Sequence, residues 1–215
     1  LVVDKITVSD WKTGEAIPGG EALDDVEFVK KTIADVLAAN KTDIELTLNS
    51  YYNSSELSAA IRDALKTTTD GSINLTLKDI TFFQTGLDNY INHCNKLKSI
   101  TLPDATEFSM WAFANCDKLE EIYAPNVSVL GSRVFNGCKG LKKIALGALT
   151  NVTLGDDSEA FFGLKTENVD LVLSESQKQM ENRNNWYSTE EDYKSTDDYT
   201  KNIFLGRQFK SVTLQ

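Results

Sequence analysis

The chain has 215 residues, of which 41% are hydrophobic and 25% charged, with 12 glycines and 3 prolines, so its composition excludes collagen-like and disordered proteins and predicts a globular fold. Its formal net charge of −10 argues against binding to nucleic acid or to anionic membranes, and no uncharged apolar run approaches the roughly 18 residues that a membrane helix needs. One histidine and three cysteines leave few side chains for transition-metal or nucleophilic chemistry.

The first 40 residues predict an N-terminal cap built around a helix. Apolar side chains recur at helical spacing at Val26, Val29, Ile33, Val36 and Leu37. A helix is therefore expected over about Leu23 to Ala39. The chain starts at Leu1 with neither an initiating Met nor a signal segment, which we interpret as the result of signal removal or of recombinant expression of a fragment.

Residues 41–90 predict strand–helix units. Period-2 alternation over Ile44 to Leu48 and over Ile73 to Leu77 is typical of short strands with one buried face. Between them, Asn53 followed by Glu56 resembles the capping box that starts a helix. The apolar face of this helix would comprise Leu57, Ala60, Ile61, Ala64 and Leu65.

A repeat of 22 residues begins at residue 91. Segments 91–103, 113–125 and 135–147 align without a gap, and matching positions hold Cys94, Cys116 and Cys138, then Leu97, Leu119 and Leu141, then Ile100, Ile122 and Ile144. Each Leu-x-x-Ile segment predicts a short strand, and one unit cannot bury its own apolar face. Stacked units make a continuous core, so the period predicts a solenoid. A looser copy extends the repeats to residue 173, with a strand at Val169 to Leu173.

The half-turns between these strands carry further apolar residues. Phe108 and Leu130, and then Phe113 and Phe135, would fill the space behind the strands. The period places Phe135 one repeat beyond Phe113, and both rings are expected to be buried.

Residues 174–215 predict an atypical C-terminal cap with a polar insert, because terminal repeats close an otherwise open core. We expect a helix near Glu175 to Asn182, a polar loop, and a last strand over Phe209 to Leu214 that nearly repeats residues 97–102. The whole chain, residues 1–215, is thus predicted to be a single α/β solenoid. Its short parallel strands would lie on one face, with helices in the N-terminal units and irregular turns in the later ones.

Three motifs in the repeats carry a family pattern: Leu97-Lys-Ser-Ile-Thr-Leu-Pro103, Trp111-Ala-Phe113 and Cys116. They resemble the BspA-like leucine-rich repeats of bacterial surface proteins, closely over about 91–147 and more loosely over 40–90 and 148–215. The departures are Ser109 at the position of Gly131, Ala124 at a strand leucine, and Leu164 near a fourth cysteine position. The resemblance implies a leucine-rich repeat fold, a cell-surface or secreted location, a role in adhesion or host contact, and no catalysis.

The three cysteines fall in one column of the repeat, so we expect free thiols stacked in the core as small hydrophobic side chains. A disulfide between neighbouring repeats is the alternative, because adjacent strands lie about 4.8 Å apart. His93 shares the column of Asn115 and Gly137, which indicates a surface turn that tolerates any polar or small residue. No metal site, no cofactor and no catalytic residue is predicted.

Two acidic runs, Asp156 to Glu159 and Glu190 to Asp192 with Asp197 and Asp198, lack the spacing of a calcium-binding loop. We interpret them as solvated loop charge, and the sequence leaves calcium binding open. The C-terminal insert also carries four aromatic residues, Trp186, Tyr187, Tyr193 and Tyr199. Stacking on sugars is one role for these rings, but we favour the interpretation that they cover the end of the core.

The outward-facing strand positions predict a binding surface. With Ile and Leu inward, these positions would hold Glu45, Thr47, Asn74, Thr76, Ser99, Thr101, Glu121, Tyr123, Lys143, Ala145, Asp170 and Val172. Tyr123 is the only aromatic residue among them and would be the natural anchor for a partner. The candidate binding face comprises Ser99, Thr101, Glu121, Tyr123 and Lys143, and an ordinary solvated sheet is the alternative.

The leading hypothesis is a non-enzymatic cell-surface or secreted repeat scaffold that binds a protein or a glycan. One alternative is a carbohydrate-active or peptidase accessory domain with its site in the C-terminal insert, which would need convergent acids in a pocket. Another is a purely structural spacer of a larger surface protein. The ligand and the oligomeric state stay open, and neither nucleic-acid binding nor membrane insertion of this segment is predicted.

Overall fold

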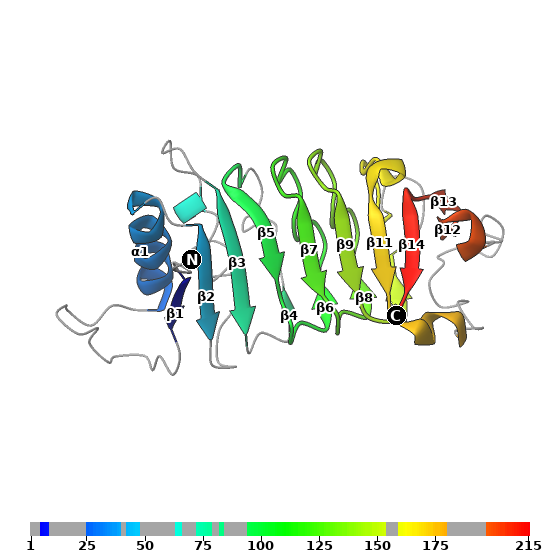
Figure 1. The fold of residues 1–215 in the computed structure, drawn as a ribbon, viewed down its shortest axis with the longest axis horizontal. Helices are drawn as coiled ribbons and strands as arrows, with labels where there is room; N and C mark the ends of the chain where they lie inside the picture. Colours follow the sequence, from blue (N-terminus) through cyan, green and yellow to red (C-terminus); the bar gives the residue numbers. More distant parts are fainter. Residues whose placement is uncertain are drawn as a thin grey trace.

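The computed structural model describes residues 5–8, 25–39, 42–47, 63–65, 72–78, 82–83, 94–153, 159–179 and 197–215. Its main sheet has eight strands, and every neighbouring pair is parallel (Figure 1). The strands follow one another across the sheet in chain order: β1 (Lys5–Val8), β2 (Asp43–Thr47), β3 (Ile73–Lys78), β5 (Leu97–Thr101), β7 (Glu121–Ala124), β9 (Lys143–Leu146), β11 (Asp170–Leu173) and β14 (Ser211–Leu214). This order is that of a solenoid, as the period predicts.

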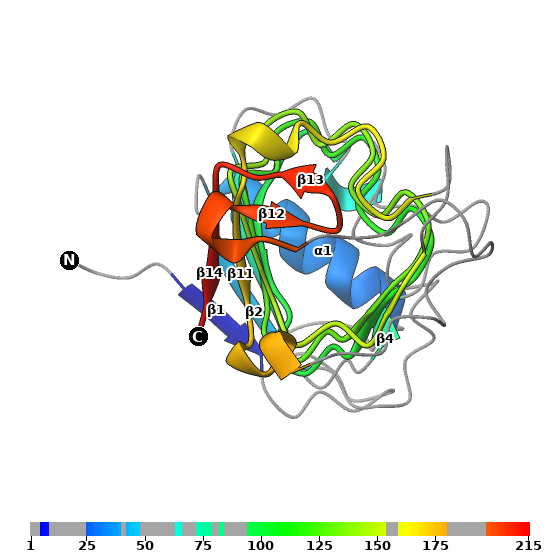
Figure 2. The ribbon, with the colours of Figure 1, turned by 90° about the vertical axis from the view of Figure 1, so that its right-hand side faces the viewer.

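A second ladder of two-residue strands lies across the core from the main sheet (Figure 2). These strands also pair in parallel and are β4 (Phe82–Phe83), β6 (Glu107–Phe108), β8 (Val129–Leu130) and β10 (Asn151–Val152). Successive turns bond to one another as well, since Ser128 N donates to Thr106 O (2.9 Å) and Thr150 N donates to Ser128 O (2.7 Å). The half-turns, expected to be irregular, therefore contain a regular hydrogen-bonded ladder.

The core between the two ladders is built from the repeated columns. Ile100, Ile122 and Ile144 are at most 1% exposed. Five rings contact one another in succession through the core: Phe108, Phe113, Phe135, Phe161 and Phe209. The prediction that Phe113 and Phe135 are buried in successive repeats is confirmed, because both are 0% exposed and their rings stack with centroids 6.4 Å apart.

One turn column holds its backbone in the left-handed region. Asn115, Gly137 and Gly163 have φ values of 60°, 76° and 73°, a conformation that Gly and Asn adopt at least cost. This column also leaves no room for a side chain at Gly137, because a Cβ there would lie 2.4 Å from the Asn115 side-chain oxygen. The column is thus more restricted than the tolerant turn position expected from the sequence. His93, assigned to the same column, lies outside the described residues.

The N-terminal end of the core is covered by α1 (Asp25–Ala38), which confirms the first predicted helix (Figures 1 and 2). Among the side chains that the structure describes in this helix, Ile33, Val36 and Leu37 are buried. Of the second predicted helix, residues 63–65 are described and helical, and Ala64 and Leu65 are buried. Its capping box at Asn53 lies outside the described residues.

The C-terminal cap differs in detail from the sequence-based expectation. The described part of the helix expected at Glu175 to Asn182 is a 3-10 helix, η3 (Glu175–Gln179). The last strand begins at Ser211 instead of Phe209, because the Phe209 ring turns into the core and packs edge-on against Phe161, 5.6 Å away.

A small antiparallel hairpin, β12 (Ile203–Phe204) with β13 (Arg207–Gln208), completes this cap. Arg207 binds the largely buried Glu159, with Nε 2.8 Å from Oε2. Thr166, in the 3-10 helix η2 (Thr166–Asn168), donates its hydroxyl to Gln208 O (2.7 Å). These contacts fasten the hairpin to the last repeats.

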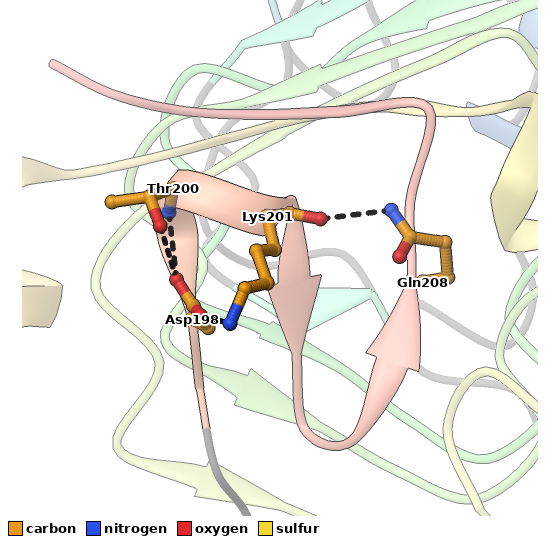
Figure 3. Close-up of polar contacts among 4 residues, drawn as sticks. All are labelled: Asp198, Thr200, Lys201 and Gln208. Carbon is orange, nitrogen blue, oxygen red and sulfur yellow. Dashed lines mark hydrogen bonds and ion pairs between the residues drawn. The ribbon is translucent and has the colours of Figure 1, made fainter.

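Asp198 organises the 3-10 helix that precedes the hairpin, η5 (Tyr199–Lys201) (Figure 3). Its carboxylate pairs with Lys201 Nζ (2.8 Å) and accepts hydrogen bonds from Thr200 Oγ1 (2.5 Å) and Thr200 N (3.1 Å). Lys201 and the Thr200 hydroxyl together lower the pKa of Asp198 to about 2. Gln208 Nε2 donates to Lys201 O (2.9 Å), so η5 and the hairpin are tied together.

Candidate binding face of the main sheet

Two rows of outward side chains run across the strands of the main sheet. In sheet order, the first row is Asp43, Asn74, Ser99, Glu121, Lys143, Asp170 and Ser211. The second row is Glu45, Thr76, Thr101, Tyr123, Ala145, Val172 and Thr213. The structure places all five residues of the candidate binding face on these rows: Ser99, Glu121 and Lys143 on the first, and Thr101 and Tyr123 on the second.

Exposure along the rows is uneven. Tyr123 is 48% exposed, whereas Ser99 and Thr101 are half-buried. Ala145, expected to face solvent, is only 3% exposed. Ala145 lies in register between Tyr123 and Val172, which carry larger side chains.

The face is hollowed where β2, β3, β5 and β7 lie side by side. The hollow is open to solvent, has a volume of about 500 Å³, and is lined by Asp43, Ile44, Asn74, Leu75, Thr76, Lys98, Ser99, Thr101, Glu120 and Glu121. Of the candidate binding face, Ser99, Thr101 and Glu121 line it. Tyr123 pairs in register with Thr101 and therefore stands next to the hollow. Lys143, on β9, lies one strand further from the hollow.

Three charged residues of this lining were missing from the predicted outward set: Asp43, Lys98 and Glu120. Asp43 precedes the inward Ile44, and strict alternation from Ile44 identifies it. Lys98 lies at an irregularity in the pairing of β3 with β5, where the register shifts between Ile73 and Asn74. Lys98 and Ser99 therefore both lie outside the core, between the buried Leu97 and Ile100. Strict alternation expects one outward residue between two inward ones, so it does not identify Lys98.

Hydrogen bonds between side chains fix one part of the hollow. Asn74 Nδ2 donates to Asp43 Oδ1 (3.0 Å), and Thr42 Oγ1 donates to Asp43 Oδ2 (2.6 Å). Ser99 Oγ in turn donates to Asn74 Oδ1 (2.8 Å). Side chains of three adjacent strands are thus held in place before any ligand arrives, which reduces the entropy lost on binding.

Two carboxylates at or near the hollow form ion pairs within the protein. Glu45 pairs with Lys78 (2.8 Å), and Glu120 pairs with Lys142 (3.1 Å). Glu121 forms no hydrogen bond or ion pair through its side chain with any described residue, and the same is true of Lys98. One carboxylate and one ammonium group are therefore available to a ligand at this site.

The three cysteines are free thiols in the core, and they do not contribute to the binding face. Burial raises the pKa of Cys116, where the neighbouring Cys94 thiol adds to the effect, and burial likewise raises the pKa of Cys138. Cys138 Sγ donates to Phe113 O (3.0 Å). Because the thiolate is the reactive form, these groups are chemically protected in the folded protein.

We predict that a thiol-reactive disulfide reagent modifies the native protein at least about 100-fold more slowly than the protein in denaturant, because reaction requires opening of the core. Burial raises the pKa of Cys116 and Cys138 above the ordinary thiol value of 9.0, which both regain on unfolding, so these two thiols stay neutral in the folded chain. Stability should therefore fall as the pH rises above about 9. Absorbance of the released thiolate and denaturant melts at pH 7 and 10 measure both effects, and rapid reaction of the native protein at pH 7 would contradict this burial.

Asp197 and Asp198, the described carboxylates of the second acidic run, have structural roles. Asp197 accepts hydrogen bonds from Leu205 N (2.8 Å) and from the Tyr199 hydroxyl (3.0 Å), and Asp198 caps η5. The Tyr199 ring packs on Phe204 with centroids 6.4 Å apart, as expected for a ring that covers the core. Trp186, Tyr187, Tyr193 and the run Glu190 to Asp192 lie outside the described residues, as do Asp156 and Asp157.

Within the described parts of the chain, no three His, Cys, Asp or Glu side chains come together to hold a metal ion. Nor does any helix in those parts have the length and apolar character needed to span a bilayer.

Comparison with known proteins identifies the repeats. Residues 87–183, which include β5 to β11, match the family model described as the BspA type leucine rich repeat region, in 6 copies. No curated protein and no solved structure gives a significant match. The matched region contains β5, β7, β9 and β11, the buried cysteine column, and the rings of Phe108, Phe113, Phe135 and Phe161. Residues 87–183 of the chain are therefore similar to the leucine-rich repeats of the BspA type.

Proposed function

We propose that this chain is a non-enzymatic recognition scaffold, at the cell surface or secreted, that binds a protein or glycan ligand on the outer face of its main sheet. The observation that carries the proposal is the hollow across β2, β3, β5 and β7, with the exposed Tyr123 ring at its border. Repeat solenoids commonly use such continuous sheet surfaces for binding, and members of this family are commonly found at surfaces.

A catalytic role receives less support from the described residues. Catalysis by acids needs convergent carboxylates with a shared reacting position. On the sheet face, Glu45 and Glu120 are held in ion pairs, and Asp43 accepts hydrogen bonds from Thr42 and Asn74. This arrangement suits recognition better than proton transfer.

We predict that Tyr123→Ala weakens ligand binding at least about 30-fold, because truncating an aromatic anchor often costs at least about 2 kcal/mol. A screen of matrix proteins and glycans against the wild-type chain identifies the ligand, and titration of the variants then measures affinity. Thr101→Lys should also abolish binding by filling the hollow. Met110→Ala is the matched control, because Met110 is similarly exposed (42%) but belongs to the half-turn side.

Binding that survives Tyr123→Ala and Thr101→Lys together would move the site off this face. The C-terminal insert would then be the next surface to test. A chain that binds none of the screened molecules would favour the spacer hypothesis.

A further inference from the structure

The floor of the hollow is made of short, uncharged polar side chains. Asn74 and Thr76 lie on β3, and Ser99 and Thr101 lie beside them on β5. The hydroxyls of Thr76 and Thr101 form no hydrogen bond with any described residue. Ser99 donates to Asn74 and keeps its acceptor lone pairs, and Asn74 keeps one amide hydrogen. The floor thus offers donors and acceptors together, as a ligand rich in hydroxyl groups requires.

The charges at the hollow do not select an ionic ligand. Glu120 is paired with Lys142, and the two groups without a described partner, Lys98 and Glu121, have opposite signs. Asp43 adds a third carboxylate to the lining, so an anionic ligand is disfavoured, while the Lys98 ammonium group disfavours a cationic one. A carboxylate such as that of Glu121 has two oxygens and can accept hydrogen bonds from two neighbouring hydroxyl groups.

The described side chains of the face also include no apolar cluster of the kind on which a stable protein interface is usually centred. Among the described residues, Met110 and Tyr123 are the exposed large hydrophobic side chains, and Tyr123 alone stands on the sheet face. A single exposed ring beside hydroxyl-bearing side chains suits the apolar face of a sugar ring, since tyrosine combines an apolar body with a polar tip.

We infer that this hollow binds a neutral oligosaccharide, whose rings lie across the strands from β3 to β7. The inference rests on the proposed function and specifies its ligand. The volume of about 500 Å³ lies within the range of about 300–1,000 Å³ usual for small-molecule sites. Polar side chains recur about every 4.8 Å across the strands. Thr76, Thr101 and Glu121 bind hydroxyl groups, and one sugar ring rests on Tyr123.

The test compares the full 215-residue chain with variants on an array of neutral, sialylated and sulfated oligosaccharides, followed by titration calorimetry with the best neutral di- to tetrasaccharide. Thr76→Val combined with Thr101→Val removes both hydroxyls but keeps the shape of the side chains. Thr213→Val makes the same change in the second row at the far edge of the sheet, outside the hollow, and is the matched control. Circular dichroism melts verify that each variant is folded.

We expect the wild-type chain to bind neutral oligosaccharides. The double valine variant should weaken that binding at least about tenfold and Tyr123→Ala at least about 30-fold, whereas Thr213→Val should leave it within about twofold. Preference for sialylated or sulfated glycans, binding unaffected by the double valine variant, or no saccharide binding at all would each overturn the inference. A protein ligand that Thr101→Lys abolishes, without any saccharide binding, would overturn the inference but leave the proposed function standing.

Discussion

Replacing Phe135 with Ala should lower the free energy of unfolding by about 3–5 kcal/mol, the usual cost of truncating a buried phenylalanine. The ring is 0% exposed and lies between Phe113, at 6.4 Å, and Phe161, at 5.5 Å between centroids. Its loss removes apolar burial, leaves a cavity and interrupts both ring contacts. Because typical domains are stable by only about 5–15 kcal/mol, this single change removes a large share of the total.

Denaturant-induced unfolding followed by circular dichroism measures this cost. Phe135→Leu retains most of the volume and should cost less than about 1.5 kcal/mol. Met110→Ala, at an exposed side chain of the half-turn, should stay within about 1 kcal/mol of the wild-type chain. A loss near zero for Phe135→Ala would mean that this ring is not in the core and that the stacking of the repeats is misassigned.

The period of 22 residues predicts the main sheet well, because each coil repeats the same inward positions. Ile100, Ile122 and Ile144 face the core, and Thr101 pairs with Tyr123 and Tyr123 with Ala145 in the register that the period requires. The second ladder was not predictable in this way. Its strands, such as β8 (Val129–Leu130), contain two residues each, too few to show alternation.

The candidate site was only partly predictable. Alternation identifies which side chains face outward, and three of the five predicted residues, Ser99, Thr101 and Glu121, line the hollow. Alternation does not predict where the outer face of the sheet is hollowed. The hollow arises where short side chains of β3 and β5 lie beside the long side chains of β7, and the register shift next to Lys98 adds a charged residue to its rim.

The closure of the C-terminal end was also beyond sequence reasoning, because it depends on contacts between distant segments. In the regular repeats, Val127 O accepts a hydrogen bond from Gly147 N of the next coil (3.0 Å). One repeat later, the donor to Leu149 O is the side-chain amide of Gln177 (3.4 Å), and Gln177 Oε1 accepts from Leu149 N (2.6 Å). A side chain thus replaces the backbone of a further repeat, and no local pattern around Gln177 signals this.

Gln177→Leu should therefore destabilise the protein by about 1–3 kcal/mol, although the substitution keeps the apolar part and approximate size of the side chain. Gln177 is 1% exposed, so Leu149 N would lose its acceptor in a site that solvent does not reach. Lys178→Ala is the control on the same 3-10 helix, because it removes only an exposed ion pair with Glu175, worth about 0–1 kcal/mol. Chemical denaturation of both variants gives the difference. Equal stability of the two would show that the Leu149 backbone finds another partner and that the amide of Gln177 does not close the ladder.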